Sequence, residues 1–302
     1  NFHVSFGNLQ QGGIMRGMEG FNRNNFRVNL DQSVRQDLTL SASAFYSTSD
    51  QDVYSENSGT PLFRLTRQPA GVDLLACEDD ITQTCEDDPE NLILVPNPFN
   101  ASESANPVYE QMVEKFKEDR DRFLASVNAR WSPMSWLAID GNASFDRLDR
   151  QREQRFPKGY RTVGPSATTN NGFLSEENRR QEGFNTSVTA TGSFELMEGI
   201  HNRSQVRYLY EQEDIWSSNL DGYRFSVEDL YTFDNVDPST FDGGSFSQSI
   251  RSDGYFLISN FDIYDRYIVD GLVRNDGSSL FGEDNRRAWY YRLAGAWRLA
   301  AE

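Results

Sequence analysis

Apolar and polar residues alternate along most of the chain with a period of two. The clearest run extends from Trp289 to Leu299, where every second residue is apolar or glycine and the residues between include two arginines. Residues 267–274 have the same form. A period of two predicts β-strands with one apolar and one polar face. Residues 276–285 between these runs are rich in Gly, Ser and Asp, so we expect a hairpin here.

The same alternation of apolar and polar residues recurs upstream and predicts about ten strands in all. The predicted strands are centred on segments 2–6, 26–34, 38–46, 123–131, 137–145, 184–196, 206–210, 255–263, 267–273 and 289–299. Every apolar row has a polar row on its opposite parity. The sequence therefore predicts an all-β, antiparallel fold.

Short and long connections alternate between these strands. Short connections are expected at 35–37, 132–136, 197–200 and 264–265, and long ones at about 10–22, 50–120, 151–181, 213–249 and 276–286. Bacterial outer-membrane barrels have short periplasmic turns and long outer loops. A soluble sandwich has no reason to keep its long loops at one end. We therefore expect a transmembrane β-barrel segment in the outer membrane, crossing it many times, with residues 276–285 facing the cell exterior.

Energetics predict which face meets lipid. An Arg or Lys on the lipid face at mid-bilayer costs about 2–4 kcal/mol, and Arg27, Arg130 and Arg207 all lie on the polar parity. The apolar parity should therefore contact outer-membrane lipid and the polar parity should line a wet lumen. Aromatic residues near the strand ends are expected to form two headgroup-level belts. These are Trp131, Trp136 and Trp297 at one level and Tyr46, Phe145, Phe184 and Trp289 at the other.

Composition agrees with a barrel. The chain has 302 residues, of which 37% are hydrophobic and 13% aromatic, and its mean hydropathy is −0.67. A soluble globule of this length would be more apolar and a disordered chain poorer in aromatics. The net charge of −17 argues against nucleic acid as a partner. The chain begins at Asn1 without a methionine, and we expect it to be a fragment or a processed chain.

Ten strands could close a small barrel by themselves. If they do not, two open edges would lie in lipid, where unpaired backbone groups cost several kcal/mol each. The alternation of connections places a short turn next after residue 302. We therefore expect further strands downstream.

The closing segment carries a family resemblance. Its hairpin turn contains Asp276, Gly277, Ser278, Ser279, Phe281 and Gly282, and the last strand contains Gly295-Ala296-Trp297-Arg298-Leu299. The chain resembles the SusC/RagA family of TonB-dependent outer-membrane transporters over nearly its whole length. Leu280 stands where that family usually has Arg.

The resemblance implies more than the spacing shows. Members of this family have barrels of about 22 strands closed by an N-terminal plug. They take up oligosaccharides or peptides, with a SusD-like surface lipoprotein over the outer loops and energy from the TonB complex. Residues 1–302 would then be a partial barrel, with the plug and the C-terminal strands outside this chain. The family resemblance implies a transporter and not an enzyme.

Cys77 and Cys85 are the only cysteines, and both fall in the longest predicted outer loop. Because that location is oxidising, we expect a disulfide between them, with two free thiols as the alternative. Their surroundings are acidic and contain Glu78, Asp79, Asp80, Glu86, Asp87 and Asp88. Calcium binds several oxygens, but this run fits no defined loop spacing, so we favour a solvated acidic loop.

Other features predict no catalytic, metal or cofactor site. The two histidines, His3 and His201, form no catalytic or metal-binding pattern. Helical spacing over 107–122 predicts a short loop helix on the barrel rim. The loop 213–249 contains Trp216, Tyr223, Phe225, Tyr231, Phe233 and Phe241, which suit either sugar binding or loop packing. Two other functions stay open at this point: a complete small outer-membrane barrel enzyme and a soluble β-sandwich binding protein.

Overall fold

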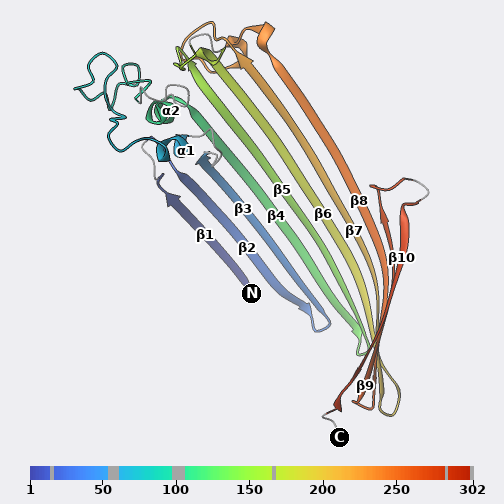
Figure 1. Ribbon diagram of the computed structural model, residues 1–302. Coiled ribbons are helices and arrows are strands. Elements are labelled where there is room, and N and C mark those ends of the chain that lie inside the picture. Colours follow the sequence, from blue (N-terminus) through green and yellow to red (C-terminus); the bar gives the residue numbers. More distant parts are fainter. Residues whose placement is uncertain (14–16, 54–60, 97–105, 165–167, 283–284, 300–302) are drawn as a thin grey trace.

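The computed structural model describes residues 1–13, 17–53, 61–96, 106–164, 168–282 and 285–299. They form one antiparallel sheet of ten strands in chain order, from β1 at one edge to β10 at the other (Figure 1). The strands are β1 (Phe2–Gln11), β2 (Phe21–Arg35), β3 (Leu38–Asp52), β4 (Lys115–Met134), β5 (Leu137–Lys158), β6 (Asn171–Met197), β7 (Ile200–Tyr223), β8 (Asp242–Ile263), β9 (Tyr267–Ser278) and β10 (Arg287–Trp297). In the described residues no pairing joins β1 to β10.

The fold class and the strand number predicted from the sequence are confirmed. The long connections all lie at one end of the curved sheet and the short turns lie at the other (Figure 1). At the turn between β8 and β9, Tyr264 and Asp265 both have positive φ, 54° and 52°. Two such residues in succession give the backbone twist that a tight hairpin needs. The expected arrangement of loops is therefore correct.

Several expected loops are shorter than predicted. The connection expected at 151–181 reduces to residues 159–170, and the one at 213–249 reduces to residues 224–241. The turn expected at 276–286 begins only after Ser278, so Asp276, Gly277 and Ser278 lie in β9. The outer halves of β5–β8 carry polar side chains on both faces. The hydrophobic periodicity is therefore lost there, although the backbone hydrogen bonds between the strands continue. β6 has 27 residues, or about 90 Å at about 3.3 Å per residue. A barrel strand needs only about 9–11 residues to cross a bilayer, so the wall extends well beyond the lipid.

Register places the apolar residues on one continuous face, called here the apolar face. Residues directly opposite each other in an antiparallel pair share a face, and Val127 is paired with both Ala42 and Ala143. Val206 is paired in the same way with Ala190 and Leu257. Their large side chains are exposed, with Val127 at 52% and Val206 at 61%. No second sheet covers this face in the described part of the chain.

The outer aromatic girdle crosses the sheet obliquely. Phe26, Tyr46 and Phe123 are paired in one row, whereas Phe145 is paired with Ala125, two residues nearer the short turns. Further along the sheet, Tyr208 and Tyr255 pair with each other lower still, with ring centroids 5.1 Å apart. The girdle residue thus shifts along the strand from one strand to the next. If all girdle residues lie at one membrane depth, the strands must be tilted to the membrane normal, as in barrels generally.

The opposite parity forms the polar face. Ion pairs and amide hydrogen bonds cross it from strand to strand. They include Arg122–Asp146 at 2.7 Å, Arg130–Asp140 at 3.3 Å, Arg292–Asp270 at 2.5 Å and Asn142 donating to Asn128 at 2.6 Å. Glu118 is fully buried between Arg120 and Arg152, with which it forms ion pairs.

Helices are confined to the loops. They are α1 (Pro61–Thr66), α2 (Pro107–Val113) and the 3₁₀ turns η2 (Thr168–Asn170), η3 (Phe233–Asn235) and η4 (Pro238–Thr240). No helix in the described ranges has the length and hydropathy needed to cross a membrane. The helix predicted over 107–122 is wrong beyond Val113. From Lys115 onward the chain pairs with β3 and β5, so Phe116 lies in β4.

The longest loop shares a small core with the connection between β5 and β6. Cys77, Cys85, Leu92 and Tyr109 of the longest loop are buried there together with Tyr160 of the β5–β6 connection. The buried Asn106 side chain donates to the carbonyls of Leu74 and Ile93 and caps α2 by accepting from the amide of Val108. This part of the loop is therefore folded against the outer end of the sheet.

Candidate functional site on the polar face

The polar face contains two adjoining cavities. The first has a volume of about 440 Å³ and lies over β4–β8, and the second has about 520 Å³ and lies over β7–β10. They share Glu211 of β7 and Ser252 of β8 in their linings. Together they form a continuous hollow on the face opposite the apolar girdle.

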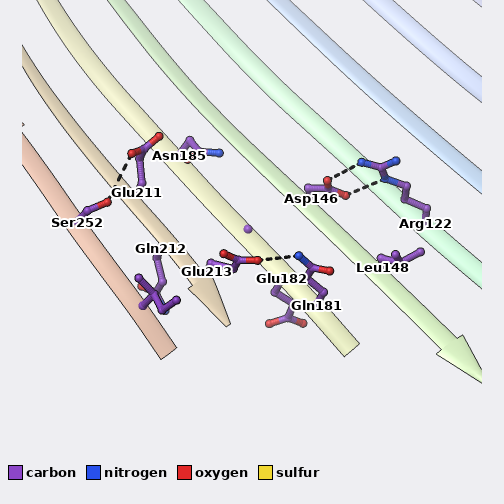
Figure 2. A pocket seen from close by; sticks show the side chains of 12 residues that line it. Arg122, Asp146, Leu148, Gln181, Glu182, Asn185, Glu211, Gln212, Glu213 and Ser252 are labelled. Carbon is purple, nitrogen blue, oxygen red and sulfur yellow. Dashed lines mark hydrogen bonds and ion pairs between the residues drawn. The ribbon is translucent and has the colours of Figure 1, made fainter. Parts of the chain in front are cut away.

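Paired polar side chains line the first cavity (Figure 2). Arg122 forms a two-pronged contact with Asp146, from Nε to Oδ1 at 3.1 Å and from Nη2 to Oδ2 at 2.7 Å. Such geometry fixes both side chains. Gln181 donates to Glu213 at 2.7 Å and Ser252 donates to Glu211 at 3.5 Å. Carboxylates, amides and a fixed guanidinium thus face the same space.

Glu211 and Glu213 differ from the other acids of this wall. They are two residues apart on β7 and both line the first cavity. Among the described residues neither has a cationic partner, whereas Asp146 is paired with Arg122. Two unneutralised carboxylates of like charge lower the potential of the cavity. A ligand that carries a positive charge is favoured there over a neutral or anionic one.

The motif turn borders the second cavity. Asp276, Gly277, Ser278 and Phe281 contribute to its lining. Ser279 ties the turn to β8, because its amide donates to the Arg251 carbonyl at 2.8 Å and its hydroxyl accepts from the Arg251 amide at 2.9 Å. Gly282 accepts from the Asn285 amide at 3.0 Å. The serines and glycines therefore shape the outer edge of the wall.

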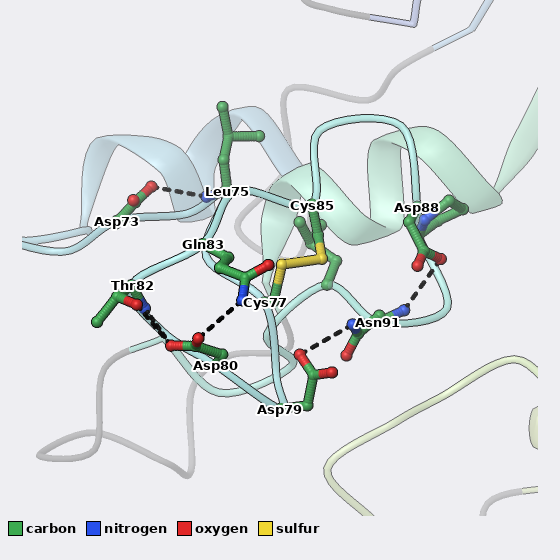
Figure 3. Close-up of a disulfide and its surroundings, with 12 residues drawn as sticks. Asp73, Leu75, Cys77, Asp79, Asp80, Thr82, Gln83, Cys85, Asp88 and Asn91 are labelled. Carbon is green, nitrogen blue, oxygen red and sulfur yellow. Dashed lines mark hydrogen bonds between the residues drawn. A yellow bond between two sulfur atoms is a disulfide. The ribbon is translucent and has the colours of Figure 1, made fainter.

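The cysteines lie outside the hollow, in the core of the long loop. A disulfide joins Cys77 to Cys85, and both are almost fully buried (Figure 3). Isolated antiparallel β-bridges pair Ala76 with Thr84 and Cys77 with Leu92 next to the disulfide.

The acids around the disulfide serve the loop itself. Asp80 accepts from the Thr82 amide and hydroxyl and from the Gln83 side chain, and these hydrogen bonds hold its pKa below the ordinary range. Asp79 accepts from Asn91, and Glu78 accepts from the Leu94 amide. The described residues contain no group of three or more His, Cys, Asp or Glu that could hold a metal.

The aromatic side chains of the connection between β7 and β8 mainly pack against one another. Phe225 is 3% exposed and contacts Tyr231 edge-on at 5.8 Å, while Phe233 contacts Phe241 at 5.7 Å. The expectation that Trp216 and Tyr223 belong to this loop is wrong, because both lie in β7. Trp216 lies within β7, opposite Arg180 of β6, because the strand continues past the last apolar residues of the girdle.

The acids of the hollow were not singled out from the sequence. Glu211, Glu213 and Asp146 fall on the polar parity like many other charged residues. The one signal available was their spacing of two on a strand, which also occurs at solvated positions. Only the register shows that Gln181, Glu211 and Glu213 face one space.

Comparisons with known proteins agree with this architecture. The chain is 24% identical over 320 residues to a TonB-dependent receptor of Formosa agariphila, a match that covers 100% of this chain and 29% of that protein. No family model matches the chain.

Solved structures show the same fold. The RagAB peptide transporter matches with a TM-score of 0.78 at 16% identity, over 100% of this chain and 33% of that one. The RagAB peptide importer in its open-open state gives 0.78 at 18% identity, over 98% of this chain and 32% of that one. The unliganded ferric citrate transporter FecA gives 0.53 at 8% identity, over 99% of this chain and 37% of that one.

The chain thus spans about a third of the length of the relatives it matches. These relatives are named as receptors and transporters, not as enzymes. The fold is that of a TonB-dependent receptor barrel wall, and the resemblance predicted from the closing hairpin is confirmed.

Proposed function

We propose that this chain forms part of the barrel wall of a SusC-like, TonB-dependent transporter in the outer membrane. The observation that carries the proposal is a sheet with one apolar and one polar face, whose long loops lie at one end (Figure 1). An exposed apolar face suits lipid, and the polar face with its hollow suits an aqueous passage. The long loops, including the motif turn at Asp276–Gly282, would face the cell exterior.

The same observation weighs against a soluble sandwich. A sandwich buries its apolar faces between two sheets. Here Val127, Val206 and Leu293 are 52%, 61% and 80% exposed on the apolar face. Removing this surface from water needs lipid or a second sheet, and the described chain contributes only one sheet.

The transporter's other parts follow from the resemblance and belong to the proposal. A plug domain would fill the lumen and carry the contact with the TonB complex, and further strands would close the barrel. A SusD-like lipoprotein would cover the outer loops. The relatives' greater length supports this division of the protein.

The cargo class is oligosaccharides or peptides, and the hollow favours peptides. Glu211 and Glu213 offer carboxylates without a cationic partner in the described structure. A peptide N-terminus, lysine or arginine would supply the missing positive charge. A neutral oligosaccharide would donate hydroxyl hydrogen bonds to these carboxylates but would leave their charge unneutralised.

Uptake by a deletion strain complemented with the full-length gene tests the proposal. The strain would grow on a peptide mixture or on an oligosaccharide mixture as the sole carbon source. We expect growth on one mixture to require the gene. In the double variant Glu211→Gln and Glu213→Gln, we expect uptake of cationic peptides to fall roughly tenfold, the equivalent of about 1.4 kcal/mol.

The control is Ser187→Ala, a small polar change on the same face outside both cavities. Equal uptake by the double variant and the control would remove the peptide assignment. Recovery of the full-length protein in the aqueous fraction, and not with outer-membrane lipid, would remove the transporter proposal itself.

A further inference from the structure

A second polar surface lies on the opposite side of the wall, above the aromatic girdle. Trp216 is 45% exposed there, on a parity that continues the apolar face of β7. Cavities of about 340 Å³ and 370 Å³ lie on either side of its indole. Both are lined by Arg180 and Trp216. The Trp216 side chain is therefore accessible to a ligand from both cavities.

Unpartnered polar groups lie beside this indole. Asp119, Gln151 and Asn178 are paired in one row across β4, β5 and β6, and all three line the second of the two cavities. Within the described ranges none of the three side chains has a hydrogen-bond partner. We define the Trp216 patch as Trp216, Arg180, Asp119, Gln151 and Asn178.

The chemistry of the patch fits a sugar ring. An aromatic face packs on the apolar CH side of a sugar, while carboxylate and carboxamide groups bind its hydroxyls. A phosphate fits less well, because two of the three arginines that line the second cavity are already held by carboxylates. Arg180 is paired with Asp149 at 2.8 Å and Arg150 with Glu177 at 2.5 Å. Further acids surround Arg180 on the same face, namely Asp119, Asp121, Glu182 and Asp214. These acids make the face less favourable to a free anion than its arginines alone would.

The height of the patch indicates where the sugar comes from. Trp216 follows Tyr210 by six residues on β7, and the Tyr210 ring lies 6.4 Å from that of the girdle residue Phe184. Six residues are about 20 Å along a strand. With a tilt of about 40° this is roughly 15 Å above the girdle. The patch also faces away from the polar hollow, so cargo in the lumen does not reach it.

We propose that the Trp216 patch binds the saccharide of a glycolipid in the outer leaflet. The proposal rests on the membrane placement given above but not on the cargo. At this height the contact requires sugars beyond those next to the lipid. Binding would anchor the outer half of the wall to the surrounding leaflet.

The test uses the full-length protein in phosphatidylethanolamine nanodiscs. One set contains lipopolysaccharide with a complete core saccharide, and another contains lipid A with only its innermost sugars. Native mass spectrometry counts the glycolipids retained. We expect Trp216→Ala, and separately Gln151→Ala with Asn178→Ala, to lose roughly fivefold of core-bearing glycolipid. Trp216→Phe should retain most binding, and lipid A retention should not change.

Asn25→Ala, an asparagine on the polar face, is the matched control and should retain wild-type binding. Equal retention by Trp216→Ala and wild type would overturn the proposal, as would an equal loss in the control. Free core oligosaccharide bound as tightly as the glycolipid would overturn the assignment to a lipid-borne sugar. Failure to enter nanodiscs at all would instead contradict the membrane placement.

Discussion

The Asp276 carboxylate lies over Gly254, its pairing partner on the neighbouring strand. A Cβ atom on Gly254 would come within 2.7 Å of Oδ1 of Asp276. The next pair reverses the arrangement, since a Cβ on Gly277 would come within 2.8 Å of Oδ1 of Asp253. Asp253 in turn forms an ion pair with Arg287 of β10. The motif residues thus make room for carboxylates that connect β8, β9 and β10.

Gly254→Ala should therefore destabilise the closing strands. We expect a loss of about 1–3 kcal/mol in the free energy of unfolding, because the new methyl group overlaps Asp276 and the Phe256 ring. Urea titration of the full-length protein in detergent measures it. Gly141→Ala is the control, since a Cβ there meets nothing within 4 Å, and it should be neutral or slightly stabilising. Equal losses in both variants would contradict this account.

The assignment of the apolar face to lipid can be tested at a residue between the two aromatic belts. Val188 is 51% exposed on β6 between Phe184 and Phe194 of the same face. We expect Val188→Lys to cost about 2–4 kcal/mol, because an ammonium group would enter the hydrocarbon. Ser187→Lys on the polar face should cost little. The fraction folded into vesicles, followed by heat-modifiable mobility, compares the two. A larger defect for Ser187→Lys would invert the assignment of faces.

The disulfide should stabilise the long loop and not the sheet. It closes a sequence separation of 8 residues, for which chain entropy accounts for about 2–3 kcal/mol. In Cys77→Ser with Cys85→Ser, we expect faster hydrogen exchange at the amides of residues 74–94, with the β5–β8 amides unchanged. Wild-type protein treated with reductant should show the same pattern. Exchange that accelerates across the strands instead would show that the loop and the sheet unfold together.

A half-buried carboxyl gives this loop a pH dependence. Burial raises the pKa of Glu114 above its ordinary value of 4.5, and the Tyr160 hydroxyl, which donates to it at 2.6 Å, opposes that rise. Burial and the nearby Glu114 charge also raise the pKa of Tyr160, so the hydroxyl stays protonated. In Tyr160→Phe the folded-state pKa of Glu114 should rise further.

The sign follows from proton linkage. A raised folded-state pKa means that the folded loop binds the proton more tightly, so its stability is greatest below pH 4.5 and falls as the pH rises through the folded pKa. Tyr160→Phe should therefore cost about 1–2 kcal/mol at neutral pH and less in acid. Hydrogen-exchange protection factors at both pH values measure it. Tyr223→Phe is the control, because its hydroxyl has no partner among the described residues. A cost independent of pH would contradict the role of Glu114.

Much of the fold was accessible from the sequence because strand parity is a local property. The rows through Val127 and Val206 alternate strictly, since one face meets an apolar medium and the other does not. The motif residues and the cysteine pair could also be identified in the sequence. The outer ends of β5–β8 were missed because both faces are polar there, and a strand without a hydrophobic face resembles a loop.

The sequence by itself thus determined ten two-faced strands, their up-and-down order and the end of the sheet at which the long loops lie. Only the tertiary structure decided which polar residues share a cavity. Gln181, Glu211 and Ser252 lie on three strands, and their meeting depends on register, which is set by pairing across the whole sheet. The same holds for Trp216, whose surroundings of Asp119, Gln151 and Asn178 come from residues up to 97 positions away along the chain. Side-chain alternation encodes a face, but pairing between distant strands places each residue along it.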